Sequence, residues 1–398
     1  MIANLLRGSP EVVGNMTTGG TESIMLAVKT VRDYARLVKP GITAPEMVLP
    51  HTAHAAFHKA AHYLGIKTVV TPFDSHTYRA DVDAMRQAIN ENTILLVASA
   101  PCYSQGVVDP IPEIGALALE NELCFHVDAC VGGIHLSFMR ELGYPVPPFD
   151  FIVPGVTSIS ADMHKYGYAA KGASVILYRD KSLRKFQFFA CTETTAYTLI
   201  NATILSTKTG GPMAGSWALL NFMGKGGYYR IVDQVQEATR RLIEGINATD
   251  DLQVLGNPDM CMFSFTSQTI DLLELADEMR TQGWYLQPQF STPLSPLNLH
   301  VSVNLGTVSN VDSFLDDLRL CLEVVRRAPP VDYSALKAAV IQILANPTPD
   351  TLQQIVALGG IQGGALPERM APINAVLEAL PDSIANALLI EYFNELYT

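Results

Sequence analysis

"TILLVASA" (93–100), "PEIGALALENE" (112–122) and "CFHVDAC" (124–130) follow one another closely in this chain. The first and third segments are short, continuous apolar runs, which is typical of strands buried on both faces. The middle segment has helical spacing and begins at a proline, a residue favoured in the first turn of a helix. Together they predict a strand, a helix and a second strand parallel to the first.

The same alternation extends in both directions along the sequence. Further apolar runs occupy residues 46–50, 67–73, 157–162 and 174–180. A helix is predicted after "TTGGTES" (17–23), where apolar residues recur at spacings of three and four: Ile24, Val28, Val31, Ala35 and Val38. Asp81 is placed to cap another helix. We therefore predict an α/β domain over residues 1–225, with a mostly parallel sheet covered by helices on both faces.

The pattern changes after residue 225. A long helix is predicted from about Tyr228 to Gly245, and "LQVLGNPDMCMFSFTS" (252–267) and "LNLHVSVNLG" (297–306) resemble antiparallel strands. These features predict a smaller C-terminal α+β domain over 226–328. Residues 329–398 are predicted to form a helical C-terminal extension, with turns at 346–350 and 359–367.

Composition excludes several classes of protein. A net charge of −12 and a pI near 5.2 argue against nucleic-acid or anionic-membrane binding, which need clustered Lys and Arg. The six cysteines show no paired spacing, so we predict neither disulfides nor a metal site. No apolar run approaches the roughly 20 residues that span a bilayer. We expect a cytoplasmic protein without a transmembrane segment.

Two lysines stand out in "SADMHKYGYAAKG" (160–172), because this segment has few other charges. Desolvation in apolar surroundings lowers the pKa of a lysine, and a neutral amine attacks aldehydes. Lys165 or Lys171 is therefore a candidate for covalent catalysis. The alternative is that one or both extend from a strand end to the surface.

Three other segments carry polar groups suited to a flat, phosphorylated ligand. The glycines of "TTGGTES" precede a helix N-terminus, where backbone N–H groups can hold a phosphate. Asp128 ends a predicted buried strand and needs a cationic or hydrogen-bonding partner, such as a protonated pyridine nitrogen. His54 could stack on a flat ring. Each signal is weak by itself, but the carboxyl ends of parallel strands bring such groups together.

Five motifs then identify a family. They are "GNMTTGGTESIMLAVKTVRDYA" (14–35), "AHAAFHKAAHYLGIK" (53–67), "GVVDPIPEIGALA" (106–118), "HVDACVGGIHLSFM" (126–139) and "GVTSISADMHKYGYAAKGASVILY" (155–178). They resemble the sphingosine-1-phosphate lyases, within the pyridoxal-phosphate-dependent group II decarboxylase family. The resemblance runs from about Gly14 to about Arg327. It implies a fold-type I pyridoxal-phosphate-dependent transferase-like fold and a homodimer with shared active sites.

The resemblance also implies roles for particular residues. Lys165 would hold the cofactor covalently, Asp128 would pair with its ring nitrogen, and His54 would stack on its ring. The implied cofactor-binding residues are Gly20, Thr21, His54, Asp128, His164 and Lys165, with Gly210 and Gly211 completing the neighbouring subunit's site. The implied catalytic residues are Lys165, Lys171 and Tyr103.

The implied reaction is retro-aldol cleavage of the C2–C3 bond of a phosphorylated sphingoid base. Its products are a long-chain aldehyde and phosphoethanolamine. A base must take the proton of the C3 hydroxyl, and an acid must then protonate C2. The sequence does not distinguish which of the implied catalytic residues performs each step.

Two departures from the family concern the substrate phosphate. Lys208 stands where the family has an arginine, and a lysine cannot form the same bidentate fork; Thr207 stands for a serine. The family also has a long segment before the phosphate loop that helps to bind the substrate phosphate, whereas here the loop begins close to Met1. We therefore expect good cofactor binding but weak substrate cleavage. Two alternatives remain open: an amino-acid decarboxylase with the same cofactor, and a non-catalytic homologue that acts as a partner protein.

Overall fold

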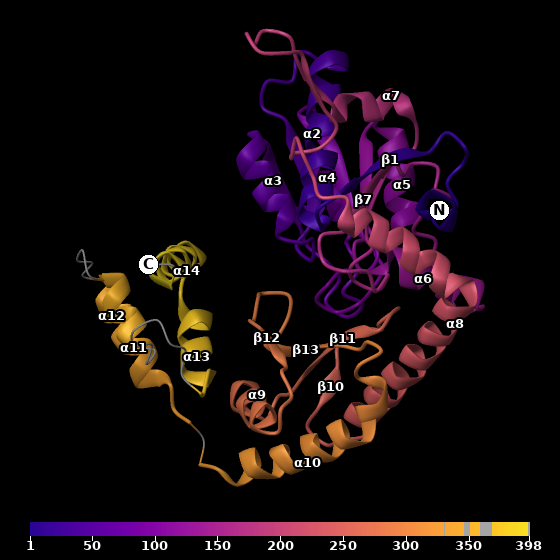
Figure 1. The fold of residues 1–398 in the computed structure, drawn as a ribbon. Coiled ribbons are helices and arrows are strands. Elements are labelled where there is room, and N and C mark those ends of the chain that lie inside the picture. The colour runs from indigo at the N-terminus through magenta and orange to yellow at the C-terminus, as the bar shows by residue number, and fades with distance from the viewer. Residues whose placement is uncertain (330, 346–350, 359–367, 397–398) are drawn as a thin grey trace. The chain divides into compact units, whose positions relative to one another are not determined.

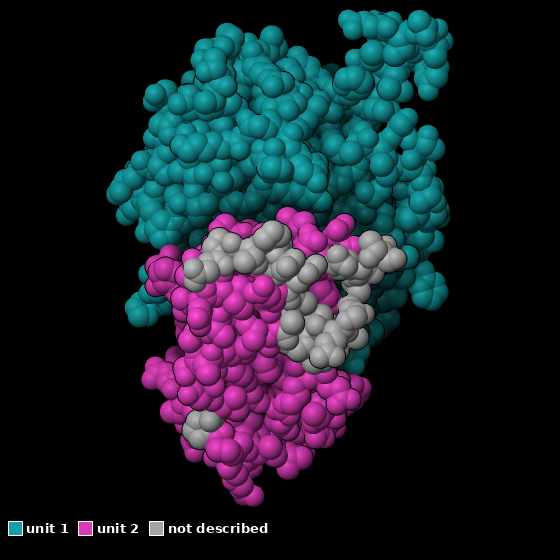
Figure 2. Space-filling model, turned by 90° about the vertical axis from the view of Figure 1, so that its left-hand side faces the viewer, with its two compact units in different colours: residues 1–240, 255–263, 302–308 teal, residues 241–254, 264–301, 309–398 magenta. Residues whose placement is uncertain are grey.

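The computed structural model describes residues 1–329, 331–345, 351–358 and 368–396. The chain divides into two compact units, shown in Figure 2. Unit 1 comprises residues 1–240, 255–263 and 302–308. Unit 2 comprises residues 241–254, 264–301 and 309–398. The division into three domains at 225 and 328 stays a prediction.

A seven-stranded sheet, all of it within residues 1–329, organises unit 1 (Figure 1). Its strand order is β1-β7-β6-β5-β4-β2-β3. The strands are β1 (Val13–Thr17), β2 (Glu46–Pro50), β3 (Lys67–Thr71), β4 (Thr93–Ser99), β5 (Cys124–Asp128), β6 (Ser158–Asp162) and β7 (Ser174–Tyr178). Neighbouring strands from β3 through β6 pair in parallel, whereas β7 is antiparallel to both β6 and β1. The predicted mostly parallel sheet is confirmed.

Helices cover both faces of this sheet (Figure 1). On one face α2 (Gly20–Val38) crosses β4 to β7 and packs against α3 (Ala56–Leu64). Alternate side chains of β2 and β4, namely Met47, Leu49, Leu95 and Val97, join these helices in one apolar core. Three further helices lie in the connections between successive strands from β3 to β6: α4 (Val82–Ala88), α5 (Ile111–Glu120) and α6 (Gly132–Glu141). Helices on both faces agree with the sequence prediction.

Two elements differ from the prediction. No strand was expected at Val13–Thr17, because glycine and asparagine weaken its strand signal; pairing with β7 makes it β1. Helix α8 (Gly211–Asn247) begins well before the predicted start at Tyr228. Gly224 interrupts α8 with a φ of 53°. An L residue rarely adopts this angle, so the sequence pattern breaks there.

The remaining elements of unit 1 are short. They are α1 (Ile2–Leu5), α7 (Lys181–Arg184), the 3-10 helix η1 (Lys185–Gln187), and the hairpin of β8 (Phe189–Cys191) and β9 (Leu199–Asn201). β8 and β9 pair antiparallel.

A second sheet, of four strands within residues 1–329, has the order β10-β11-β13-β12. Its strands are β10 (Gln253–Val254), β11 (Met262–Thr266), β12 (Gln287–Gln289) and β13 (Asn298–Ser302). β10 pairs antiparallel with β11, as β12 does with β13, in agreement with the strand pattern of the sequence. Helices α9 (Leu272–Thr281) and α10 (Val311–Arg327) accompany this sheet.

The C-terminal part of unit 2 is helical, with α11 (Ser334–Ala345), α12 (Thr351–Leu358), α13 (Ala371–Ala379) and α14 (Asp382–Leu396). The buried carboxylate of Asp277 on α9 accepts hydrogen bonds from the N–H groups of Met370 and Ala371, 2.9 and 2.8 Å away, at the start of α13. The predicted turns at 346–350 and 359–367 lie outside the described residues. Among the described helices, none combines the length and apolar character required to cross a bilayer.

Candidate active site

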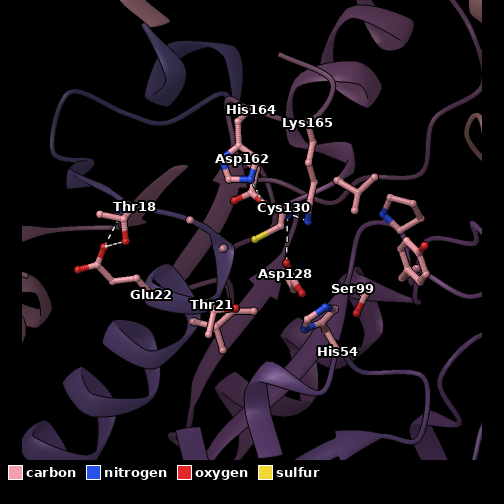
Figure 3. Close-up of a pocket in the computed structure, with 16 residues that line it drawn as sticks. Thr18, Thr21, Glu22, His54, Ser99, Asp128, Cys130, Asp162, His164 and Lys165 are labelled. Carbon is pink, nitrogen blue, oxygen red and sulfur yellow. Dashed lines mark hydrogen bonds and ion pairs between the residues drawn. The ribbon is translucent and has the colours of Figure 1, made fainter. Parts of the chain in front are cut away.

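A cavity of about 480 Å³ lies at the carboxyl ends of β4, β5 and β6, beside the first turn of α2 (Figure 3). This is where an open parallel sheet binds its ligands. The lining includes these predicted site residues: Gly20, Thr21, His54, Tyr103, Asp128, His164 and Lys165. Segments far apart in the sequence therefore converge on one space.

The first turn of α2 forms one wall of the cavity. A Cβ atom on Gly20 would lie 2.8 Å from Cys130 Sγ and 2.9 Å from Asp162 Oδ2, so only glycine fits there. Glu22 Oε2 closes the preceding turn by accepting from the N–H and hydroxyl groups of Thr18, at 2.6 and 2.8 Å. The N–H groups of Gly20 and Thr21 have no acceptor among the described residues. They are available to an anion.

Three residues around the end of β6 form a charged group. Lys165 Nζ lies 3.0 Å from Asp162 Oδ2, and His164 Nε2 lies 3.6 Å from the same oxygen. The N–H of Ala173 donates to His164 Nδ1 at 3.1 Å. The ring proton of a neutral His164 therefore belongs on Nε2, which faces Asp162.

Electrostatics at Lys165 differ from the sequence expectation. Burial lowers the pKa of Lys165, but Cys130, Asp162 and Asp128 raise it more, so the net pKa lies above the ordinary value. The expectation of a lowered pKa was wrong, because it considered the apolar neighbours in sequence and not the carboxylates that the strand ends bring to Nζ. For His164 the net pKa is lowered, chiefly by burial.

Asp128, at the end of β5, presents one carboxylate oxygen to the cavity. Its Oδ1 accepts from the N–H of Cys130 at 3.0 Å and from the hydroxyl of Ser160 at 3.3 Å. Its Oδ2 has no hydrogen-bond partner among the described residues. Burial raises the pKa of Asp128, but the Lys165 charge and the Cys130 N–H group lower it by more. The net pKa therefore lies below the ordinary value, and the carboxyl group is ionised.

His54 and Tyr103 border the cavity from loops. The N–H of Ala56 donates to His54 Nδ1 at 3.1 Å, which holds the imidazole at the start of α3. Figure 3 shows His54 next to Asp128, with Lys165 extending toward them from the opposite side. Tyr103 follows β4 and is 39% exposed.

Three predicted site residues do not line the cavity. Lys171 is exposed and lies outside the lining. Burial lowers the pKa of His164 and the charge of Lys171 lowers it further, whereas Asp162 raises it. Gly210 and Gly211 lie at the start of α8. Lys208 Nζ donates to the carbonyl of Met16 at 2.6 Å. The predicted roles of Lys171, Gly210 and Gly211 stay predictions.

Sequence reasoning assigned no role to Asp162 or Ser160. Both lie on β6, where Ser158, Ser160 and Asp162 alternate with apolar residues. Side chains two residues apart share one face of a strand, so this period was the available signal. Their partners on other strands could not be read from it.

The residues around the cavity fit pyridoxal phosphate. Free N–H groups at the first turn of α2 suit its phosphate, Asp128 Oδ2 suits its protonated ring nitrogen, and Lys165 Nζ suits its aldehyde. The parallel sheet and this set of groups define a fold-type I pyridoxal-phosphate-dependent protein.

Comparison with known proteins agrees. Residues 1–268 match the conserved domain of the pyridoxal-dependent decarboxylases, and 334–395 match a C-terminal domain of pyridoxal-dependent enzymes named for a helix-turn-helix. The chain belongs to the pyridoxal-dependent decarboxylase family, which confirms the predicted cofactor and the resemblance.

Several relatives carry the name sphingosine-1-phosphate lyase. The chain is 42% identical to the Arabidopsis thaliana enzyme over 97% of this chain and 64% of the relative, and 39% identical to the rat enzyme over 85% and 59%. The solved Burkholderia pseudomallei sphingosine-1-phosphate lyase has a TM-score of 0.78 at 36% identity, covering 88% of this chain and 80% of that one. Glutamate decarboxylase from Lactobacillus brevis, at 21% identity and a TM-score of 0.74 over 83% and 79%, shares the fold. The chain spans about three fifths of the length of the curated relatives it matches.

Proposed function

We propose that the chain is a pyridoxal-phosphate-dependent aldehyde lyase that cleaves the C2–C3 bond of a phosphorylated sphingoid base. The products would be a long-chain aldehyde and phosphoethanolamine. The observation that carries this proposal is the 36% identity to a solved lyase over 80% of its length, against 21% for a decarboxylase of the same fold. The cavity groups support the cofactor requirement, which the lyase and decarboxylase reactions share.

The cofactor-binding roles follow the cavity. Lys165 would hold the cofactor covalently, Asp128 Oδ2 would accept from its ring nitrogen, and the ring of His54 would lie on its face. The N–H groups of Gly20 and Thr21 would bind its phosphate, with His164 nearby. Bound pyridoxal phosphate would supply an electron sink for the pair released when the C2–C3 bond breaks.

The chain itself must move two protons. One leaves the C3 hydroxyl as the aldehyde forms, and one reaches C2 of the remaining fragment. Lys165, once it has released the cofactor, and Tyr103 both border the cavity, while Lys171 lies outside its lining. We propose that these three residues share the transfers, with Asp162 holding the Lys165 amine in place.

We also propose that the protein works as a homodimer. Large apolar side chains are exposed along the β8–β9 hairpin, the segment that follows it and the first part of α8: Phe189, Tyr197, Ile200, Ile204, Leu205, Met213, Trp217 and Phe222. Exposed apolar side chains in such numbers are typical of an interface. A second copy covering them would bring Gly210 and Gly211 toward its own cofactor site. The cytoplasmic location stays a prediction.

Product analysis separates the candidate activities. The cofactor-loaded protein is incubated with sphingosine 1-phosphate, or with glutamate and aromatic amino acids. Long-chain aldehyde and phosphoethanolamine in equal amounts support the lyase, whereas carbon dioxide from an amino acid supports the decarboxylase alternative. Bound cofactor without any turnover would support a non-catalytic homologue.

A further inference from the structure

A buried histidine lies two residues before Asp128 on the same strand. His126 is fully buried, and its ring packs edge-on against Phe57 of α3, with ring centroids 5.9 Å apart. In the parallel register of β5 and β6, His126 lies opposite Ser158 and Asp128 lies opposite Ser160. Because side chains alternate along a strand, all four point to the same face of the sheet.

Hydrogen bonds join these four side chains. His126 Nδ1 lies 2.8 Å from Ser158 Oγ, and His126 Nε2 lies 3.2 Å from Ser160 Oγ. The Ser160 hydroxyl donates to Asp128 Oδ1 at 3.3 Å. It also accepts from the thiol of Cys130, with 3.3 Å between Sγ and Oγ.

The direction of each bond follows from counting protons. The single hydroxyl proton of Ser160 goes to Asp128, so His126 Nε2 must donate to Ser160 Oγ. Burial lowers the pKa of His126 to about 4, which makes the ring neutral at pH 7 with one proton. Nδ1 is then an acceptor, and the Ser158 hydroxyl donates to it. In this series of hydrogen bonds, every donated proton points toward Asp128.

We propose that Ser158, His126 and Ser160 form a hydrogen-bond relay that positions Asp128. By keeping the carboxylate ionised, the relay keeps the proton shared with Asp128 on the cofactor's ring nitrogen. The inference rests on the proposed function, in which Asp128 Oδ2 accepts from that nitrogen. Hydrogen bonds to a carboxylate favour its ionised form, so the relay lowers the basicity of Asp128. These are positioning residues, because none of them lines the cavity.

Removing the Ser160 hydroxyl makes the relay testable. In Ser160→Ala, Asp128 loses the hydroxyl of Ser160 and keeps its hydrogen bonding with Cys130. Loss of a hydrogen bond to a charged group changes the equilibrium between its protonated and ionised forms by about tenfold or more. The proton should therefore shift about tenfold from the ring nitrogen toward Asp128 Oδ2. The control is Ser137→Ala, which removes another buried serine hydroxyl, one that donates to the Gly133 carbonyl at 2.8 Å outside the relay.

The measurement is nitrogen NMR of the full-length protein, loaded with pyridoxal phosphate that is isotopically labelled at the ring nitrogen. We expect a pyridinium signal in the parent and in Ser137→Ala. In Ser160→Ala the signal should move toward that of an unprotonated pyridine. Ser158→Ala, at the far end of the relay, should produce a smaller shift in the same direction and provides the test if Ser160→Ala does not fold.

Two results would overturn the inference in distinguishable ways. A pyridinium signal that disappears in Asp128→Ala but is unchanged in both serine variants would leave Asp128 as the ring partner and eliminate the relay. An unprotonated ring nitrogen in the parent would remove Asp128 from that role, and the relay with it.

Discussion

Lys165 Nζ lies 3.0 Å from Oδ2 of Asp162, a carboxylate whose side chain is 1% exposed. The other oxygen of Asp162, Oδ1, is buried without a hydrogen-bond partner among the described residues. Asp162 therefore depends on Lys165, with His164 slightly farther away, to compensate its charge. The raised pKa of Lys165 reflects this pairing together with Cys130 and Asp128.

Replacing Asp162 by asparagine should make Lys165 reactive at lower pH. Asp162→Asn removes a negative charge that favours the ammonium form, so the pKa of Lys165 should fall. The measurement is the rate at which pyridoxal phosphate attaches to the cofactor-free protein across a pH series. Asp33→Asn, at an ion pair with Lys29 outside the cavity, is the matched control. An unchanged pH profile in Asp162→Asn would show that this pairing does not govern Lys165.

Lys165→Ala should abolish covalent attachment of the cofactor, whereas Lys171→Ala should preserve it. Nζ of Lys165 borders the cavity, and Lys171 lies outside the lining. Attachment is measured by borohydride reduction followed by peptide mass spectrometry. Modification of Lys171 in the parent protein would contradict the assignment.

Asp128→Ala should reduce kcat/KM by on the order of a hundredfold or more. The variant removes the carboxylate that would keep the ring nitrogen protonated, and losses of about 3 kcal/mol are typical of such electrostatic groups. Aldehyde release with saturating cofactor provides the measurement. Activity within a few-fold of the parent would remove Asp128 from the site.

His135 should make the protein less stable in acid. Burial lowers the pKa of His135 to about 4, whereas an unfolded histidine titrates near 6.5. The contribution of the neutral ring to the free energy of unfolding is therefore fully present above pH 6.5. It is lost as the pH falls toward 4, by about 3 kcal/mol in total. Urea unfolding of His135→Leu should show a weaker decline over this range than the parent. His62→Leu, on an exposed histidine of α3, should match the parent.

Phe222→Asp should weaken the proposed dimer. Phe222 is 86% exposed on the first part of α8, and a buried carboxylate in an interface is costly. Analytical ultracentrifugation should show a dimeric parent and a variant shifted to monomer. Ile390→Asp, a comparable change on α14, should remain dimeric. A monomeric parent that still binds cofactor tightly would eliminate the shared-site proposal.

Local patterns predicted much of the sheet. The run at 93–100 became β4 at Thr93–Ser99, and the run at 124–130 became β5 at Cys124–Asp128, because continuous apolar segments between helices have few alternatives to a buried strand. The same patterns placed Asp128 at a strand end. They did not predict β1, whose residues become a strand only through hydrogen bonds to β7.

The sequence by itself determined the strand and helix pattern of the large sheet, the candidate residues at the strand ends and the family motifs. Periodicity and composition are local properties, so they can be read along the chain. Only the tertiary structure decided that Lys165 is paired with a buried carboxylate, and that His126 reaches Asp128 through Ser160. Asp162 and Lys165 are only three residues apart, but the burial of Asp162 is a tertiary property. The path from His126 to Asp128 depends on the register between β5 and β6, which neither strand encodes alone.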